Sequence, residues 1–441
     1  MKINNEKENG QVLVILALVL VGLLGFTALV VDGGTIFADR RFDQSAADAS
    51  AVAGAVAAAQ TIENLYITNG SFACNSSGVI QAKQAAATAA INRSADNRFT
   101  ISSLSSKAEL DAAKHGVFIN CGIEDHDAWQ QGYIDVMVDI SSDVATTFAH
   151  LFYPGNIRNS VEAVARVKPR TSGAFGYAIA ALDKNCKSNY GNLKISGNST
   201  VTINNSGMFS NSCIKGNGNV VVTADEGIRY VDGYSKDGGV TISPTPSQTS
   251  EELPTFTYPS ADADCALLPD RGSVNKNGND SVTLEPGRYS KITINKGTVT
   301  MNPGLYCVSG DFKITGGNTT GMDVMIYMQK DGNKNTDFVT NGSATINISA
   351  PRTGNWFGML LYMAHGNEGE LTIAGNSDSS YTGTVYAPNA HVNVGGNNST
   401  LGNYSTQIIA YTVEIFGTTE MEINFDDTIH YSNPSFIDMY E

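Results

Sequence analysis

An uncharged apolar run near the start of the chain constrains the fold more than any other feature. The segment 12–31 contains no charged side chain. A helix rises about 1.5 Å per residue, so a helix over roughly 20 residues is about 30 Å long, the thickness of a bilayer core. We therefore expect residues 12–31 to form a transmembrane helix that follows a cytoplasmic tail, residues 1–11.

Two kinds of proteolytic processing, secretion-signal cleavage and prepilin cleavage, are alternatives to a permanent membrane anchor. The run is too long for the core of a secretion signal, and the small-residue motifs in SAADASAVAGAVAAA begin roughly fifteen residues beyond it, too far for cleavage at the membrane surface. Gly10 suits a prepilin cleavage site, but Ile15 stands where such sites carry glutamate. A retained helix is favoured, and it could pack against other apolar helices through Gly22, Gly25 and Thr27.

The cysteines indicate on which side of the membrane the rest of the chain lies. All six follow the apolar run, and none is part of a CxxC motif. We expect disulfides in an oxidising compartment, paired in sequence order, although about fifteen pairings are possible and buried thiols are the alternative. The flanking lysines and arginines are equally frequent on the two sides of the apolar run, so charge does not indicate its orientation. The disulfide argument alone places the C-terminal side outside. The expected pairs are Cys74 with Cys121, Cys186 with Cys213, and Cys265 with Cys307.

Composition limits the classes of function. A chain of 441 residues exceeds one typical core, and its 41% hydrophobic content indicates a folded protein. The net charge of −15 would repel a phosphate backbone, which argues against nucleic acid as a partner. Only 16% of the residues are charged and 44 are glycine, a balance typical of β-rich extracellular proteins.

Residues 32–170 have the pattern of a small α+β domain. Ala-rich helices are predicted over about 35–66 and 80–93. Strands are predicted where Ile134, Val136, Val138 and Ile140 alternate, and again around Val161, Val164 and Val167. The first helix would lean on the domain through its larger apolar side chains, Phe37, Phe42, Val52, Val56 and Ile62.

The order of motifs in the first sixty residues resembles one known family. A Gly10-Gln11 start, the apolar helix, the step at Asp32-Gly33 and the Ala-rich ADASAVAGA stretch follow one another as in TadG-like proteins of the Tad (Flp) pilus-assembly group. The resemblance covers about residues 9–60. It implies a single-pass envelope protein, linked to pilus biogenesis or surface attachment, with most of its mass outside the cytoplasmic membrane. We expect the small α+β domain after the helix to be pilin-like.

Residues 171–441 consist of short β-branched runs that end in Gly and Asn. TLEPGRY at 283–289 recurs as TMNPGLY at 300–306, and VMIYM at 324–328 recurs as MLLYM at 359–363. Such repeats predict a parallel β-helix with rungs of about 17–35 residues, Pro-Gly corners, and Tyr289 stacked on Tyr306. A β-sandwich is the alternative. The Pro- and Ser-rich segment 243–264 is predicted to be an exposed insertion.

The C-terminal part adds a second resemblance. The pattern in residues 349–396, with AP near its start and YAPNA near its end, resembles the β-solenoid regions attached to many TadG-like proteins.

Candidate catalytic or metal sites are weak. The six histidines stand alone, without HExxH or an i, i+4 pair. EDHD at 124–127 is predicted to be a solvated loop. Asp331, Asn333 and Asn335 resemble the start of a calcium loop, but Thr336 and Gly342 replace its required glycine and acid. We expect no enzyme activity and no cofactor.

These observations predict a membrane-anchored surface protein of a pilus system. The expected partners are pilus or envelope proteins, contacted through the helix and the α+β domain, a second copy in an oligomer or filament, and a surface glycan or a ligand on a neighbouring cell. The runner-up hypothesis is a membrane-held β-helix that binds or cleaves polysaccharide, with Asp127 and Asp331 as test positions.

Overall fold

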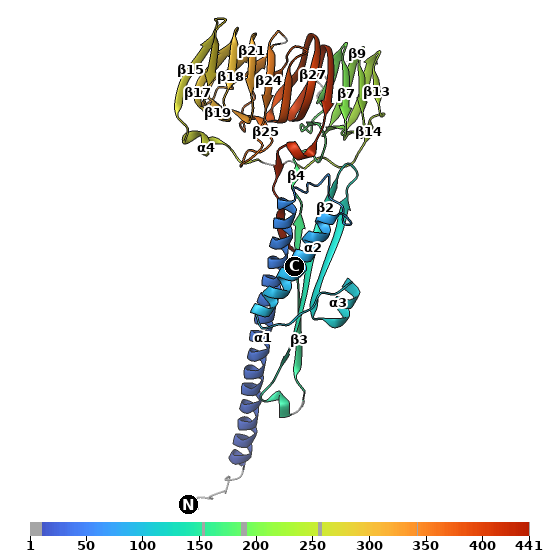
Figure 1. Cartoon of the computed structure of the whole chain (residues 1–441). Coiled ribbons are helices and arrows are strands. Elements are labelled where there is room, and N and C mark those ends of the chain that lie inside the picture. Colours follow the sequence, from blue (N-terminus) through green and yellow to red (C-terminus); the bar gives the residue numbers. More distant parts are fainter. Residues whose placement is uncertain (1–10, 152–154, 187–191, 255–257, 342, 441) are drawn as a thin grey trace, which may run out of the picture.

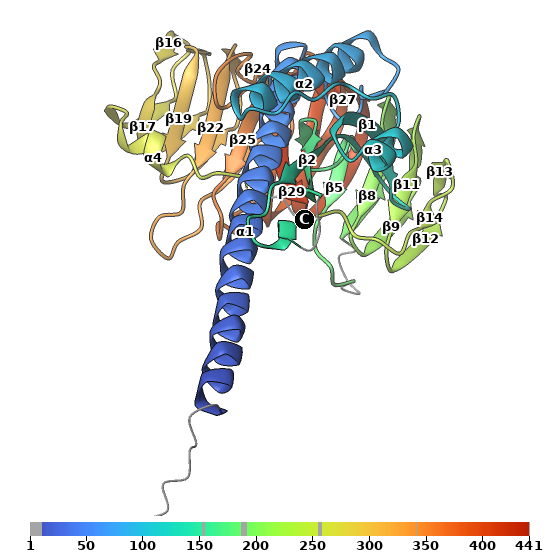
Figure 2. The same cartoon turned by 90° about the horizontal axis from the view of Figure 1, so that it is seen from below.

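A long helix and a small antiparallel sheet form a stalk, and a solenoid lies across its upper end as a head (Figure 1). The structure is a computed structural model that describes residues 11–441 except 152–154, 187–191, 255–257, 342 and 441. Gly10 and the rest of the expected cytoplasmic tail up to residue 10 lie outside the described residues. Seen from below, the stalk meets the middle of the head (Figure 2).

One uninterrupted helix, α1 (Gln11–Asn64), contains both the apolar run and the first Ala-rich segment. The sequence suggests two elements separated by Asp32, Gly33 and Gly34, but the helix passes through all three residues. Two glycines cost a helix about 1 kcal/mol each, and the leucine- and alanine-rich turns on both sides compensate for this. The apolar run is therefore continuous with the stalk.

The stalk core lies between two helices and a four-stranded sheet. The helix α2 (Ser77–Asp96) begins at Ser76, whose side chain accepts a hydrogen bond from the Val79 amide, and packs with α1 on one face of the sheet. The sheet has the order β1 (Gly116–Asp125), β2 (Gln130–Val144), β3 (Ile157–Lys168), β29 (Phe436–Tyr440). A short helix, α3 (Lys107–Ala113), precedes β1, and a 3-10 turn, η1 (Ala149–Leu151), lies between β2 and β3.

Small side chains make the contact between α1 and this core. Phe37 is 71% exposed and Phe42 is 47% exposed, whereas the buried face of α1 is formed mainly by alanines: Ala46, Ala47, Ala51, Ala55, Ala58 and Ala59. The prediction that the large apolar residues hold α1 to the domain is correct for buried Ile62 and for Phe42, whose ring centroid lies 5.8 Å from that of Phe99, and wrong for exposed Phe37. Close packing explains the difference, because a Cβ atom at Gly54 would lie 2.8 Å from Val136 and 2.9 Å from the Ala86 carbonyl.

The strands of the stalk sheet alternate as a half-buried sheet requires. Ile134, Val136, Val138 and Ile140 are all fully buried, as predicted. In β3, however, the buried face consists of Val161, Ala163, Ala165 and Val167. Val164 has the wrong parity for this face, because side chains on one face of a strand are two residues apart.

The head is a parallel β-helix with 23 strands in its described residues. Each pairing between its described strands is parallel, which fits the predicted solenoid and not a hairpin-based sandwich. The first half contains β5 (Ile179–Ala181), β6 (Leu193–Gly197), β7 (Thr200–Asn204), β8 (Met208–Ser210), β9 (Cys213–Gly218), β10 (Val221–Ala224), β11 (Ile228–Tyr230), β12 (Gly233–Gly238), β13 (Thr241–Ser243) and β14 (Ser247–Gln248).

The second half begins at the opposite end of the head (Figure 1). It contains β15 (Asp270–Lys276), β16 (Ser281–Leu284), β17 (Gly287–Ile294), β18 (Thr298–Met301), β19 (Gly304–Val308), β20 (Phe312–Ile314), β21 (Asn318–Gly321), β22 (Val324–Met328), β23 (Phe338–Thr340), β24 (Thr345–Ser349), β25 (Met359–Met363), β26 (Leu371–Ile373) and β27 (Ser380–Asn424).

The two halves meet in the middle of the head. The end of β27 pairs with β5, β6 and β7, so that Ile408 lies beside Ile179, Val413 beside Leu193 and Met421 beside Val201. The chain therefore enters the solenoid at its centre, builds one half outward, crosses to the far end and returns.

Residues 249–254 and 258–269 form the described part of this crossing. The segment includes a short helix, α4 (Asp262–Ala266), and its residues Leu253 and Tyr258 are each 1% exposed. The prediction of an exposed insertion over 243–264 is therefore wrong for these side chains, because the segment packs against the base of the head.

The internal repeats correspond to neighbouring rungs. Thr283 pairs with Thr300, and Tyr289 stacks on Tyr306 with ring centroids 5.9 Å apart, as predicted. VMIYM lies beside MLLYM, with Tyr327 paired to Tyr362. Of the two predicted Pro-Gly corners, only Gly304 has a positive φ, at +139°.

Three disulfides join the pairs that follow the order of the cysteines. Cys74 bonds to Cys121 in the stalk, Cys186 to Cys213 in the first half of the head, and Cys265 to Cys307 between α4 and β19.

The end of the chain returns to the stalk. After the 3-10 turn η2 (Asp427–Ile429), β28 (Ser432–Asn433) pairs with β4 (Thr171–Ser172), and β29 then pairs antiparallel with β3. The expected boundaries, 32–170 and 171–441, therefore miss that residues 436–440 belong to the stalk sheet.

Candidate functional site

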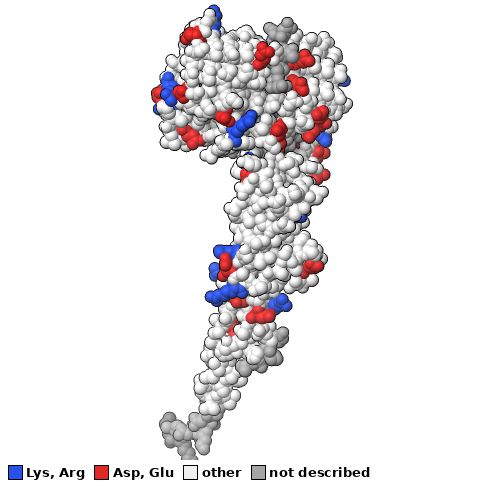
Figure 3. Space-filling model, in the orientation of Figure 1, with Lys and Arg blue, Asp and Glu red and all other residues white. Residues whose placement is uncertain are grey.

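The exposed apolar segment of α1, residues 12–31, is the first feature that requires a functional explanation. Its large side chains are exposed, from 46% for Val31 to 72% for Leu13. The helix is long and apolar enough to cross a membrane, and its most apolar window is entirely outside the protein core. Figure 3 shows no charged side chain along this lower part of the stalk, with Lys, Arg, Asp and Glu appearing only above it.

Small residues make the surface of this helical segment shallow at three positions, Gly22, Gly25 and Thr27. A Cβ atom added at Gly22 or at Gly25 would meet no atom within 4 Å, so both positions face open space. The Thr27 hydroxyl donates to the Leu23 carbonyl within the helix. Close helix packing in a membrane uses such shallow positions, and nothing in the described part of the chain covers these.

Asp32 fastens the upper end of the apolar segment to the stalk. Its carboxylate accepts hydrogen bonds from three backbone amides, Thr147 at 2.8 Å, Phe148 at 2.9 Å and Ala149 at 2.5 Å. These amides start the turn η1, where amide hydrogens have no partner inside the helix. Asp32 is thus an N-terminal cap supplied by a distant helix, and it ties the β2–β3 connection to the point where the apolar segment ends.

Replacing Asp32 by alanine is expected to loosen this turn. Three amides would lose a charged acceptor, so hydrogen exchange at residues 147–149 should accelerate at least about tenfold. Asp143, exposed and without a hydrogen bond among the described side chains, supplies the matched control Asp143→Ala. Unchanged exchange in Asp32→Ala would contradict the assigned role.

A second contact holds α1 to the sheet just above. The Ser142 hydroxyl lies 2.6 Å from both Asp39 and Asp43. Burial raises the pKa of Asp43, the neighbouring Asp39 raises it further, and the Ser142 hydrogen bond only partly offsets both effects. This contact fixes the rotation of α1 relative to β2.

The turn between β1 and β2 connects the stalk to the head. His126 stacks on Trp129 with centroids 3.6 Å apart and lies 3.1 Å from Glu251 of the crossing segment. Asp127 accepts a hydrogen bond from the Ser250 amide, and the Tyr177 hydroxyl donates to the Ala128 carbonyl. The prediction of a solvated loop at 124–127 is correct for the exposed side chains of Asp125 and Asp127. It is wrong in that β1 extends to Asp125 and half-buried His126 packs on Trp129 at the base of the head.

A buried histidine lies where the chain leaves the solenoid. His430 is 1% exposed and stacks on Phe425, and neither ring nitrogen has a hydrogen-bond partner among the described residues. Burial lowers its pKa to about 4, and the charge of Asp426 opposes this only weakly. Nearby, Asp427 accepts hydrogen bonds from Thr68 and the Gly70 amide, which joins η2 to the loop after α1.

His430 is expected to make the protein less stable in acid. Between pH 6.5 and about 4, His430 is protonated in the unfolded chain and neutral in the folded protein. The free energy of unfolding should therefore fall by about 3 kcal/mol as the pH is lowered over this range. His430→Phe should lose this part of the pH dependence in denaturant titrations at pH 7 and pH 4.5. Other groups, including Asp427, titrate in both proteins and cancel in the comparison. Identical pH dependence would refute the assignment.

The weak calcium candidates share one turn between β22 and β23. The backbone of Asp331 forms two hydrogen bonds with that of Lys334, and Asn335 accepts a hydrogen bond from the Glu368 amide with its side-chain oxygen. Asn333 lies in the same turn and is exposed. Across the described residues, no group of three His, Cys, Asp or Glu side chains is placed to hold a metal ion.

The fold and this site together define a class: a β-solenoid head carried by a stalk on a helix able to span a membrane. Residues 10–58 match the family model described as "Putative Flp pilus-assembly TadE/G-like". The N-terminal segment of the chain is therefore similar to the TadE/G-like proteins of Flp pilus assembly, which confirms the resemblance in the sequence. The match ends within α1 and does not include the head.

Other comparisons add little. No curated protein matches the chain. A solved structure titled "Crystal structure of an ice binding protein from an Antarctic Biological Consortium" aligns at 11% identity over 57% of this chain and 89% of its own, with a TM-score of 0.23. So low a score supports no argument about this protein.

Proposed function

We propose that the protein is a non-enzymatic, membrane-anchored component of a Tad/Flp-type pilus system. Residues 12–31 lie in the membrane, and the stalk and head lie on its outer side. The observation that carries the proposal is the continuity of α1, which runs from the family-matched, exposed apolar segment into the stalk core without a break.

Continuity matters because it couples the anchor to the head. The Ala-rich half of α1 is buried against α2, β2 and β3, and Asp32 and Ser142 tie it to the sheet. The turn at 126–129 and the return of β29 connect that sheet to the head. These contacts restrict rotation of the head relative to α1, so the stalk holds the head at a fixed distance from the membrane.

The finer proposal is that the helix and sheet of the stalk act as a pilin-like domain and that the protein is an attachment subunit. A long helix packed along an antiparallel sheet, with its apolar half free, is suited to insertion among other apolar helices. The head then supplies a polar surface held away from the membrane.

Deletion of the gene in its native host tests the proposal. We expect fewer surface pili by negative-stain electron microscopy, or pili that no longer support surface attachment. The full chain should restore the phenotype, whereas a chain without residues 12–31 should not. Normal pili and normal attachment in the deletion strain would refute the proposal.

A further inference from the structure

A groove on the flank of the head gathers polar side chains from four neighbouring stretches of the chain. It has a volume of about 590 Å³, within the range of ligand pockets. We call it the corner groove, and its lining residues are Asp183, Asn192, Glu368, Asn389, His391, Tyr411 and Thr412.

The corner groove lies where the two halves of the solenoid meet. The Asp183 amide donates to the Tyr411 carbonyl, and the Val413 amide donates to the Asn192 carbonyl. On the other side, Leu371 pairs with Val392, which brings Glu368 near His391. Residues separated by more than 200 positions therefore form one continuous groove across successive rungs.

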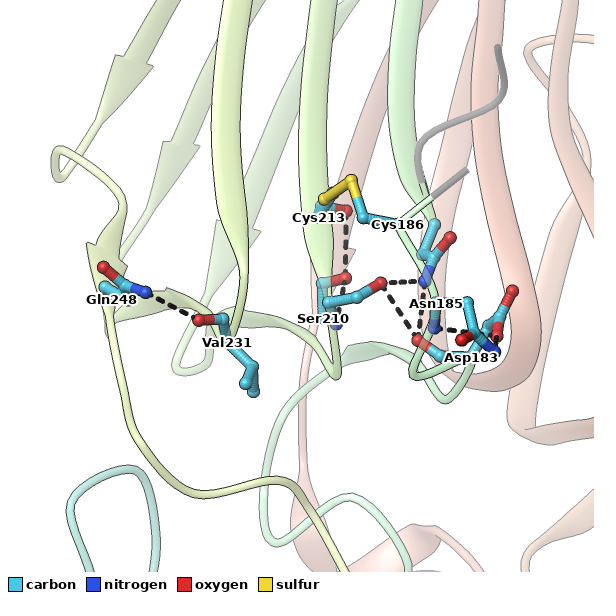
Figure 4. The surroundings of a disulfide bond; sticks show 9 residues. Asp183, Asn185, Cys186, Ser210, Cys213, Val231 and Gln248 are labelled. Carbon is cyan, nitrogen blue, oxygen red and sulfur yellow. Dashed lines mark hydrogen bonds between the residues drawn. A yellow bond between two sulfur atoms is a disulfide. The ribbon is translucent and has the colours of Figure 1, made fainter. Parts of the chain in front are cut away.

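The floor of the groove is built and rigid. Asp183 is 2% exposed and Asn192 is 1% exposed, and the side-chain NH₂ group of Asn192 donates to the Asp183 backbone carbonyl at 2.6 Å. The Asp183 carboxylate accepts a hydrogen bond from the Asn185 amide at 3.0 Å. Figure 4 shows Asp183 and Asn185 beside the disulfide Cys186–Cys213, which ties this segment to the next rung.

The walls offer donors, acceptors and an aromatic ring. Asn389 uses its side-chain oxygen to accept from the Gly366 amide, which leaves the NH₂ group as its donor. His391 is held by Thr412 at 2.7 Å and by Asn393 at 3.0 Å. Tyr411, partly exposed, hydrogen-bonds to Asp183, and Glu368 is exposed at the rim.

These groups suit a neutral ligand with many hydroxyl groups. Carboxylate, amide and imidazole groups can each bond to hydroxyls, and a phenol ring can pack against the apolar face of a sugar. Among the described lining residues there is no Lys or Arg, and their two carboxylates would repel phosphate, sulfate or uronate groups.

We propose that the corner groove binds a short neutral oligosaccharide. The inference goes beyond the proposed pilus function and does not depend on it, because it rests on the head alone. The two proposals can fail separately. If the protein serves a pilus but binds no glycan, only this inference fails, and if it binds a glycan but serves no pilus, only the proposed function fails.

Binding to the purified full chain, in a detergent without sugar head groups, tests the inference by titration calorimetry. The probes are cellotriose, maltotriose and chitotriose, with trigalacturonate as the anionic comparison. We expect a Kd below about 1 mM for at least one neutral probe and at least about tenfold weaker binding of trigalacturonate. Tyr411→Ala and Asn389→Ala should each weaken the neutral probe at least about tenfold.

The control Tyr66→Ala, in the stalk and 66% exposed in its native form, should bind like the native chain. Asn389 is exposed, so its substitution leaves the fold intact even where Tyr411→Ala perturbs it. The inference fails if no neutral probe binds at about 10 mM, if trigalacturonate binds best, or if Asn389→Ala binds the neutral probe as tightly as the native chain.

Discussion

Replacing Leu20 and Leu24 by arginine is expected to release the protein from the membrane. Both side chains are exposed, at 55% and 58%, and lie near the middle of the apolar segment, so neither substitution disturbs a contact within the protein. Each arginine near the centre of a membrane helix costs about 3 kcal/mol on insertion scales, and the pair about 6 kcal/mol. The double variant should leave the membrane pellet after carbonate extraction or be degraded.

The matched control is Leu20→Ile with Leu24→Ile, which keeps the segment apolar and should stay in the pellet. A double-arginine variant that is still integrated, at native abundance and resistant to extraction, would show that residues 12–31 do not anchor the chain.

Loss of the stalk disulfide is expected to have the second-largest effect. Cys74 and Cys121 are 47 residues apart, and closing a loop of this size restricts the unfolded chain by about 4 kcal/mol. Both residues are only half-buried, so Cys74→Ser with Cys121→Ser removes the cross-link without burying new polar groups. The free energy of unfolding of the stalk should fall by about this amount in denaturant titrations followed by hydrogen exchange.

Reduction of both proteins supplies the control, because it opens the two head disulfides in each, and the reduced native protein and the reduced double variant should then have the same stalk stability. A variant as stable as the oxidised protein would contradict the calculation. The prediction applies to protein that has been exported, because the disulfide forms only in an oxidising compartment.

The periodic features of the sequence predicted much of this fold. The alternation at 134–140 places β2 with its apolar face inward, and the two PGxY repeats place Tyr289 on Tyr306. Both are local signals: a strand has a period of two, and a rung repeats because it stacks on a copy of itself.

Features that depend on distant partners could not be predicted. The alanine face of α1 follows from the close approach of α2, which no property of residues 46–59 alone reveals. His430 looks like an isolated polar residue until Phe425 covers it. The entry of the chain at the centre of the solenoid brings Asp183 beside Tyr411, so the corner groove has no signature in either segment.

The Asp32 contact is an intermediate case. The sequence marks Asp32 as an acid at the end of an apolar helix, which suggests a boundary, but its partners at 147–149 lie more than 110 residues away. A carboxylate followed by two glycines is a weak local signal. Only the return of the β2–β3 connection shows which amides it caps.

Labelling of lysines with a membrane-impermeant amine reagent, read by mass spectrometry on spheroplasts, tests most directly whether α1 holds the head outside the membrane. Lys236 and Lys334 are exposed on the head, whereas Lys2 and Lys7 precede the apolar segment. We expect the head lysines to react in intact spheroplasts and Lys2 and Lys7 to react only after permeabilisation. Head lysines that react only after permeabilisation would contradict the orientation and with it the proposed function.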